Sequence, residues 1–244
     1  MKAKTTTSHA AGAAQALAAL KELANPEQAA NAQRFFRTGP GEYGAGDVFL
    51  GIRVPELRAL AKRFGALSLV DLLELLRSPL HEARFLALVL LVESYRRGDP
   101  AQRQRVFDAY LASTDRINNW DLVDVSAPHV VGAHLLGGDG ALLDRLAASP
   151  SLWERRIAML ATFAFIRAGR LEVPLRIARL LLHDGHDLIH KAVGWMLREV
   201  GQRSREAEEM FLAEHYRSMP RTALRYAIEK FPPERRRAYL EGTI

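Results

Sequence analysis

Apolar residues recur at intervals of three and four along almost the whole chain, while strict apolar–polar alternation is scarce. Such spacing places apolar side chains on one face of an α-helix and is not typical of strands. The pattern predicts helices near residues 12–24, 27–37, 54–64, 68–77, 81–96, 101–113, 119–134, 140–147, 151–168, 173–182, 186–201, 204–215, 221–230 and 233–240.

Short segments rich in proline, glycine, serine and aspartate separate these predicted helices. They are SPL at 78–80, GDP at 98–100, GGDG at 137–140, SPS at 149–151 and HDGHD at 183–187. Helix pairs recur at a period of roughly 30–40 residues, although their sequences are not alike. We therefore expect an all-α, HEAT-like solenoid (an ARM/HEAT superhelix) with a concave face. A single domain would cover residues 12–244, after a flexible tail at residues 1–11.

One glycine-rich segment interrupts the helical pattern. TGPGEYGAGDVFLGI, residues Thr38–Ile52, holds five of the 17 glycines, arranged around Tyr43. Its composition predicts a short β-hairpin or an ordered glycine loop. Either form is a plain connector or an element that projects toward a partner. It is not a phosphate-binding Walker loop, because the GK[ST] ending is absent.

Charge and composition narrow the function classes. Lys+Arg 34 against Asp+Glu 28 gives a net charge of +6, and only six of the 34 are lysine. An arginine-rich surface suits a polyanion such as DNA, although a GC-rich genome also raises arginine content. The absence of cysteine excludes disulfides and thiolate chemistry. No apolar run approaches the roughly 20 residues of a membrane-spanning helix, and MKAKTTTSHA lacks the apolar core of a secretory signal, so we expect a cytoplasmic protein.

The first candidate for chemistry is INNWDLVD, residues 117–124. Helical spacing puts Trp120 and Asp124 on one side, while Leu122 and Val125 face the core. Asn118 or Asn119 is suited to the N-cap of this helix, and Asp121 is suited to its positively polarised N-terminus. Asp124 is then the acid for which the pattern gives no structural role. The alternative is an indole and a carboxylate brought together by packing alone.

Two further stretches carry tryptophan beside cations. In HKAVGWMLREVG, Trp195 lies opposite the apolar stripe, near Lys191 and Arg198, as expected for stacking or sugar contact beside phosphates. In LWERRIAML, Arg155 and Arg156 oppose the helix dipole, which indicates a nearby anion. Spacing does not choose between these two arginines. The alternatives are an indole covered by a neighbouring helix and a solvated arginine pair.

Other polar residues are assigned structural roles. His183, His186 and His190 straddle a predicted loop and helix start, so we expect capping and no metal. Glu74, Glu82 and Glu93 are predicted to be charges on solvent-facing helix surfaces.

NNWDLVD, LWERRIAML and HKAVGWMLREVG, preceded by FLGIRVPELRALAK at 49–62, together resemble the bacterial DNA alkylation repair family, the AlkD-like DNA glycosylases. The resemblance covers about residues 25–230. It implies a C-shaped HEAT-like array whose concave, basic side holds double-stranded DNA. It also implies hydrolysis of the N-glycosidic bond of cationic N3- or N7-alkylated purines, without the usual extrusion of the base into a pocket.

The resemblance also assigns residues. It places the catalytic carboxylate at Asp124, the two site tryptophans at Trp120 and Trp195, and an arginine that holds a backbone phosphate at Arg156. Phe35 matches an aromatic residue of an early helix. The residues expected to bind DNA are Phe35, Tyr43, Arg155, Lys191 and Arg198. A fixed carboxylate stabilises the oxocarbenium character of the sugar electrostatically, so no metal or cofactor is expected, and the protein is expected to be a monomer.

One departure supports a second hypothesis. GPGEYGAGD resembles the hairpin-like insertion of a related branch, whose members bind DNA, including branched DNA, without evident base excision. A non-catalytic protein that recognises duplex or branched DNA is therefore the alternative function. A HEAT-type protein–protein scaffold is the third, and it leaves the Trp/Asp/Arg set unexplained.

Overall fold

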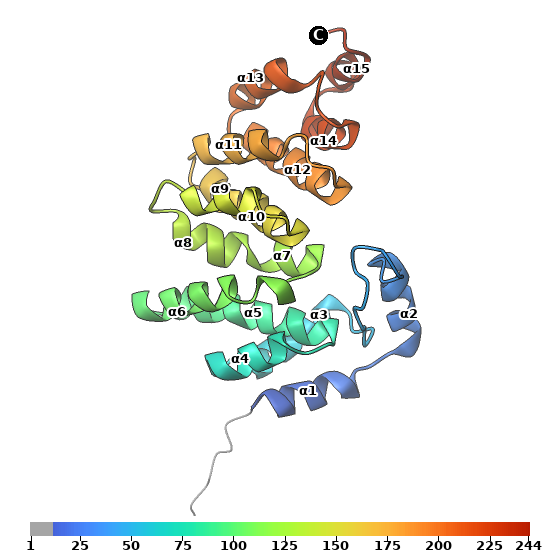
Figure 1. The fold of residues 1–244 in the computed structure, drawn as a ribbon, viewed down its shortest axis with the longest axis vertical. Helices are drawn as coiled ribbons and strands as arrows, with labels where there is room; N and C mark the ends of the chain where they lie inside the picture. The colour runs from blue at the N-terminus through green and yellow to red at the C-terminus, as the bar shows by residue number, and fades with distance from the viewer. Residues whose placement is uncertain (1–11) are drawn as a thin grey trace, which may run out of the picture. The chain divides into compact units, whose positions relative to one another are not determined.

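A computed structural model describes residues 12–244, which form helices joined by short loops (Figure 1). The predicted tail, residues 1–11, lies outside the described residues. Backbone contacts divide the chain into two compact units, Met1–Leu122 and Val123–Ile244, each of which is described by itself. The single domain expected from the sequence remains a prediction. Within the described residues, no helix is long and apolar enough to cross a membrane.

The first unit is built around one long central helix. Helix α5 (His81–Arg97) packs against α1 (Ala13–Glu22), α3 (Val54–Arg63), α4 (Leu69–Leu76) and α6 (Pro100–Leu111) (Figure 1). Helix α2 (Pro26–Phe35) precedes the glycine-rich segment, and the short helix η1 (Thr114–Arg116) follows α6. Most of α5 is buried, including its N-terminal residues His81 and Glu82. A helix surrounded in this way must satisfy its buried polar residues internally.

The glycine-rich segment Thr38–Ile52 folds as a loop of turns, so that of the two predicted forms the glycine loop is confirmed. Its only bridge pairing within the described residues joins Val48 to Leu80 in parallel. Gly51 has a φ of +80°, and a Cβ there would lie 2.2 Å from the carbonyl oxygen of Asn25. Glycine is therefore required at this position, where the loop returns against the start of α2.

The prediction that Glu82 is a solvent-facing charge was wrong. Its side chain is buried, and its carboxylate accepts hydrogen bonds from the backbone N–H groups of Leu50 at 2.9 Å, Gly51 at 2.8 Å and Ile52 at 3.2 Å. A loop packed against a helix has no strand partner for these N–H groups, and Glu82 provides the acceptor.

The helix predicted at 119–134 is interrupted at a proline. Helix α7 (Trp120–Ser126) is followed by a π-helical turn, η2 (Pro128–Gly132), and by α8 (Ala133–Leu135). Proline cannot donate the regular hydrogen bond, and the N–H of Gly132 donates to Ala127, five residues back, at 2.9 Å. Within α7, Leu122 and Val123 are buried and Val125 is half-buried.

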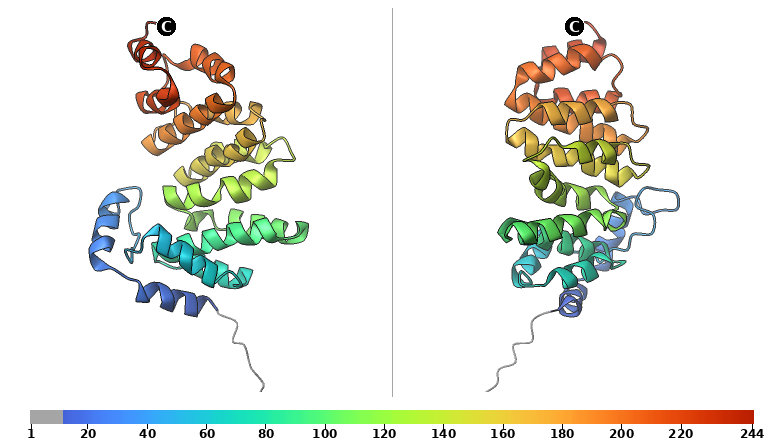
Figure 2. Two further views of the ribbon diagram at one scale, coloured as in Figure 1. Left: turned by 180° about the vertical axis from the view of Figure 1, so that it is seen from behind. Right: turned by 60° about the vertical axis from the view of Figure 1, so that its left-hand side comes forward.

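The second unit is built around two long helices that pack on each other. Helix α10 (Leu152–Arg167) contacts η2, α9 (Ala141–Ala147), α11 (Glu172–Leu181) and α12 (Asp187–Arg203) (Figures 1 and 2). Helix α12 in turn packs on α13 (Arg205–His215) and closely on α14 (Arg221–Ala227), and η3 (Ile228–Lys230) and α15 (Pro233–Glu241) end the chain. The predicted all-α helical-repeat fold is confirmed, and apart from the interrupted helix at 119–134 the helix ends lie within a few residues of those expected.

Candidate functional site

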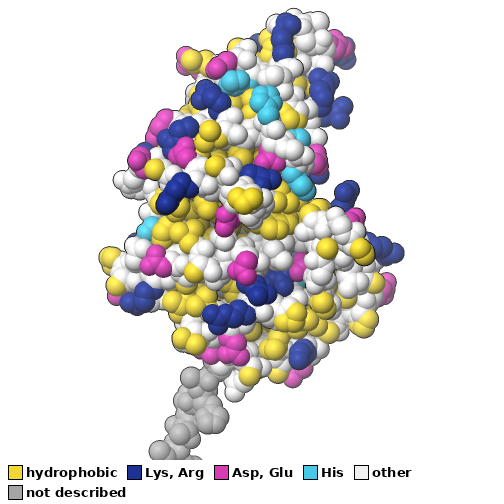
Figure 3. All heavy atoms as spheres, viewed as in Figure 1, with side chains coloured by type: hydrophobic (Ala, Val, Ile, Leu, Met, Phe, Trp, Pro, Cys, Tyr) yellow, Lys and Arg dark blue, Asp and Glu magenta, His cyan; other side chains and the backbone are white. Residues whose placement is uncertain are grey.

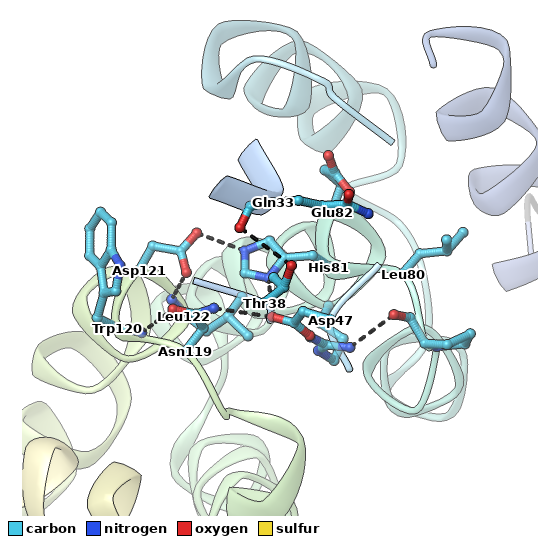
Figure 4. A network of polar contacts seen from close by, with 12 residues as sticks. Gln33, Thr38, Asp47, Leu80, His81, Glu82, Asn119, Trp120, Asp121 and Leu122 are labelled. Atoms are coloured by element: carbon cyan, nitrogen blue, oxygen red, sulfur yellow. Dashed lines mark hydrogen bonds and ion pairs between the residues drawn. The ribbon is translucent and has the colours of Figure 1, made fainter. Parts of the chain in front are cut away.

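A buried network of charged side chains lies at the N-terminal end of α5 in the first unit (Figure 4). The imidazole of His81 lies between two carboxylates, with Nδ1 3.0 Å from Asp47 Oδ2 and Nε2 2.8 Å from Asp121 Oδ2. Arg84 donates to the other oxygen of Asp47. Because an ionised carboxylate only accepts hydrogen bonds, both ring nitrogens of His81 must donate, which requires the imidazolium form.

The protonation of His81 follows from these partners. Burial alone would lower the pKa of its imidazole, but hydrogen bonds and charge from Asp121 and Asp47 outweigh it and raise the pKa from 6.5 to about 9. For Asp47, burial acts to raise the pKa, and the hydrogen bond from His81 together with the charge of Arg84 brings it below its usual value. His81 is therefore a fixed cation at neutral pH and not a poised general base.

The same network holds the glycine loop against the start of α7. Asn119 Nδ2 donates to Asp47 at 3.1 Å, and Asn119 Oδ1 accepts from the N–H of Trp120 at 2.8 Å. Gly44 lies beside them, and a Cβ at this position would meet the carbonyl oxygen of Phe36 at 2.4 Å. Asp121 accepts from the N–H of Leu122 at 2.9 Å, in keeping with its predicted structural role at this helix start.

Stacked aromatic rings extend from this network to Trp120. Phe49 stacks on His81 with ring centroids 4.3 Å apart, and Phe36 stacks on Phe49 at 4.9 Å. Trp120 stacks on Phe36 at 5.2 Å, with Phe35 edge-on to it at 5.9 Å. Two candidate residues, Trp120 and Phe35, are thus in contact. Phe35 is 66% exposed, which is unusual for phenylalanine and fits a residue that contacts a partner.

In the second unit, Asp124 and Arg156 form a bidentate ion pair. Arg156 Nε donates to Oδ1 of Asp124 at 2.9 Å and Nη2 donates to Oδ2 at 2.8 Å, while Nη1 donates to the carbonyl of Leu188 at 2.6 Å. These bonds tie together α7, α10 and the first turn of α12. The Arg156 side chain is 5% exposed and that of Asp124 18%. The resemblance predicts that Arg156 holds a phosphate, whereas its guanidinium here is directed to the carboxylate it orients.

Arg155 joins two loops by hydrogen bonds, whereas Arg156 binds the carboxylate of Asp124, so the structure distinguishes the two arginines. Its Nη1 donates to the carbonyls of Ser149 at 3.0 Å and Pro150 at 2.9 Å, and its Nε donates to Asp184 at 2.6 Å. In the first unit, Arg84 makes the same contacts with the carbonyls of an equivalent Ser-Pro pair at 78–79. Both arginines follow the serine by six positions, so the two segments share an S-P-x-x-x-x-R pattern although the surrounding sequences are not alike.

Trp195 lies half-buried on α12, and its indole N–H donates to Glu199 at 3.0 Å. The two cations expected beside it are paired with acids: Lys191 contacts Asp187 at 2.8 Å, and Arg198 contacts both Glu199 and Glu229. Since Trp120 belongs to the first unit and Trp195 to the second, their convergence on one site remains a prediction.

Tyr43 and the histidines complete the candidate residues. Tyr43 is half-buried within the glycine loop. His186 caps α12 through Nδ1, which accepts from the N–H of Leu188 at 3.1 Å, and His190 contacts the carbonyl of Asp184. Among residues 12–244, no group of three or more His, Asp or Glu side chains is arranged to hold a metal ion. The face shown in Figure 3 carries basic and acidic side chains interspersed.

The sequence reasoning missed Asp47, His81 and Glu82. The signal available for the last two was their position at the start of 81–96, a segment whose later residues are apolar on every side. Polar residues at the entrance of such a helix require buried partners. Asp47 had no comparable signal, because its partners come from 34 and 37 residues further along the chain.

Comparison with known proteins identifies the family and the fold of the chain. A family model described as "DNA alkylation repair enzyme" matches residues 16–231. A solved structure described as a predicted DNA alkylation repair enzyme from Enterococcus faecalis is 19% identical, with a TM-score of 0.69, over 86% of this chain and 97% of that one. That likeness shows the fold. No curated protein sequence matches significantly. On the family match, which covers most of its length, this chain belongs to the DNA alkylation repair enzyme family.

Proposed function

We propose that this protein is a DNA glycosylase that removes N3- or N7-alkylated purines from double-stranded DNA. The observation that carries the proposal is the carboxylate of Asp124, which Arg156 holds through two hydrogen bonds while part of its side chain remains exposed. Breaking the N-glycosidic bond of an alkylated purine builds positive charge on the sugar, and a fixed carboxylate stabilises that charge without reorganising.

The other residues support this role. Trp120 and Trp195 offer electron-rich ring faces to the deoxyribose and its developing charge. Arg156 is a positioning residue, because its hydrogen bonds fix the carboxylate. Alkylation has already made the purine a cationic leaving group, so the reaction requires neither a strong general acid nor a metal or cofactor. The proposal further holds that the protein acts on DNA as a monomer in the cytoplasm.

The experiment is base release from methylated duplex DNA, comparing the wild type with Asp124→Asn. We expect the variant to lose on the order of 10²–10³-fold in rate. Asp144→Asn is a matched control. Arg176 donates to Asp144 from Nε at 3.0 Å and from Nη2 at 2.9 Å, which is the same bidentate arrangement as that of Arg156 and Asp124. The control should retain wild-type activity. Absence of base release by the wild type would exclude the glycosylase.

A second candidate function is recognition of duplex or branched DNA without base excision. The observation that favours it is the exposed Phe35, at the entrance of a glycine loop that is anchored by buried residues. Affinity for plain and branched duplexes across a salt series tests it. Binding without base release, with affinity that falls as salt rises, would favour this function. Absence of salt-dependent binding would exclude both candidates.

A further inference from the structure

The first unit contains a cavity of about 290 Å³ that the proposed chemistry at Asp124 does not use. It lies between α2, the end of the glycine loop and the N-terminal part of α5. The residues that matter here are Phe35, Phe36, Phe49, Phe85, Glu82 and Asp121. The size is close to the lower end of the roughly 300–1,000 Å³ of small-molecule sites, and it suits one small ring system.

The walls of the cavity favour a flat ring. Phe36 and Phe49 are stacked on each other, 19° apart with ring centroids 4.9 Å apart, which leaves no space for a ring between them, and Phe36 is also stacked on Trp120. An occupant would therefore lie against the outside of this stack, since aromatic side chains accept planar heterocycles without selecting a base sequence. The exposed Phe35 stands at the same cavity and offers a further ring to an occupant.

The charge at the cavity favours a cation. The charged cluster at the cavity contains three carboxylates, those of the buried Asp47 and Glu82 and of the half-buried Asp121, and two cations, His81 and Arg84, so that one negative charge is in excess. Both oxygens of Asp121 already accept one hydrogen bond each, and an ionised carboxylate oxygen accepts a second. Phenylalanine faces also attract cations.

We propose that this cavity binds a single planar nitrogen heterocycle of nucleobase size, and that it prefers one with delocalised positive charge. N-alkylated purines have this chemistry. The choice of ligand rests on the proposed function, but binding to the cavity does not require catalysis. The glycine loop then has the role of positioning Phe49 at the cavity. The loop is held on one side of Phe49 by the hydrogen bond between Asp47 and His81 and on the other by the hydrogen bonds from the N–H groups of residues 50–52 to Glu82.

The test is calorimetric titration of the full chain with 7-methylguanosine, a cation in mildly acidic buffer, and with guanosine, its neutral counterpart. We expect the methylated nucleoside to bind at least about tenfold more tightly. Ala32→Phe should abolish binding, because Ala32 lines the cavity from α2. Ala30→Phe places the same ring at an exposed position of that helix and should leave binding unchanged.

Equal binding of the two nucleosides, absence of binding, or full binding by Ala32→Phe with wild-type circular dichroism would each overturn the proposal. Should Ala32→Phe fail to fold, Asn31→Ala, at an exposed lining residue, takes its place and should weaken binding severalfold. Unchanged affinity in that variant would also overturn the proposal.

A competition experiment distinguishes two possible ligands, an alkylated base that is still part of a DNA strand and a free alkylated base. Displacement of 7-methylguanosine by a duplex with one unpaired methylated purine indicates a base still in the strand, and its retention indicates the free base. Binding is measured without DNA and base release without added nucleoside, so failure of this proposal is distinguishable from failure of the glycosylase.

Discussion

Each unit fixes an aspartate with an arginine, but the two sites differ in how far water reaches them. In the first unit, Asp47 is 3% exposed and is surrounded by Arg84, His81 and Asn119. In the second unit, Asp124 has a bidentate arginine and an 18% exposed side chain. The carboxylate of Asp47 is used by buried hydrogen-bond donors, whereas that of Asp124 is held by Arg156 and remains partly accessible to solvent. We infer that the first stabilises the fold and that the second is available for chemistry.

The largest effect that would test this comparison is expected in the first unit. Asp47→Ala leaves Arg84 and His81 buried without their shared carboxylate, which should lower the free energy of unfolding by about 3–5 kcal/mol. Urea denaturation measures it. Asp99→Asn is the control, because Asp99 caps α6 at an exposed position and asparagine caps equally well. A cost below about 1 kcal/mol for Asp47→Ala would show that the network is not structural.

The pH dependence of stability should follow His81. Its pKa is about 9 in the folded protein and 6.5 without its partners, so the folded state binds this proton more tightly. The resulting stabilisation is fully present below pH 6.5 and is lost as the pH rises through about 9, a change of about 3 kcal/mol. Urea denaturation across that range should show the decline in the wild type and in His183→Gln, an exposed control, but not in His81→Gln. An equal decline in all three would assign the effect to another group.

These two predictions concern residues that the amino-acid sequence did not reveal, for a physical reason. Helices were predictable because apolar spacing and breakers are local, and all-α order follows from them. Asp124 and Arg156 were proposed from local patterns and resemblance, and the structure pairs them. The partnership of Asp47 with His81 depends on a loop that returns to the start of α5, which no local pattern encodes. Charged residues in an apolar segment, as at 81–84, are the general sign that such partners exist.

A smaller effect on stability is expected at the second site. Asp124→Asn keeps an acceptor for Arg156 and stays partly solvated, so the free energy of unfolding should fall by about 1–2 kcal/mol, although activity falls far more. Asp144→Asn, whose ion pair with Arg176 is more exposed, should cost less than about 1 kcal/mol. Chemical denaturation alongside the base-release assay gives both quantities. If Asp124→Asn destabilised the protein as much as Asp47→Ala, the second site would be structural as well.

The smallest effect concerns the two arginines of the S-P-x-x-x-x-R segments, Arg84 and Arg155. Lysine carries a single ammonium group and cannot bridge two carbonyls and a carboxylate as the guanidinium fork does. Arg155 is 20% exposed, so water replaces part of what Arg155→Lys loses, and we expect a cost of about 1 kcal/mol. Arg84→Lys should cost more, since Arg84 is 6% exposed and its partner Asp47 would stay buried. Thermal and urea unfolding of both variants measures the difference. Equal costs would mean that the identical local contacts dominate, and that burial does not separate the two units as we infer.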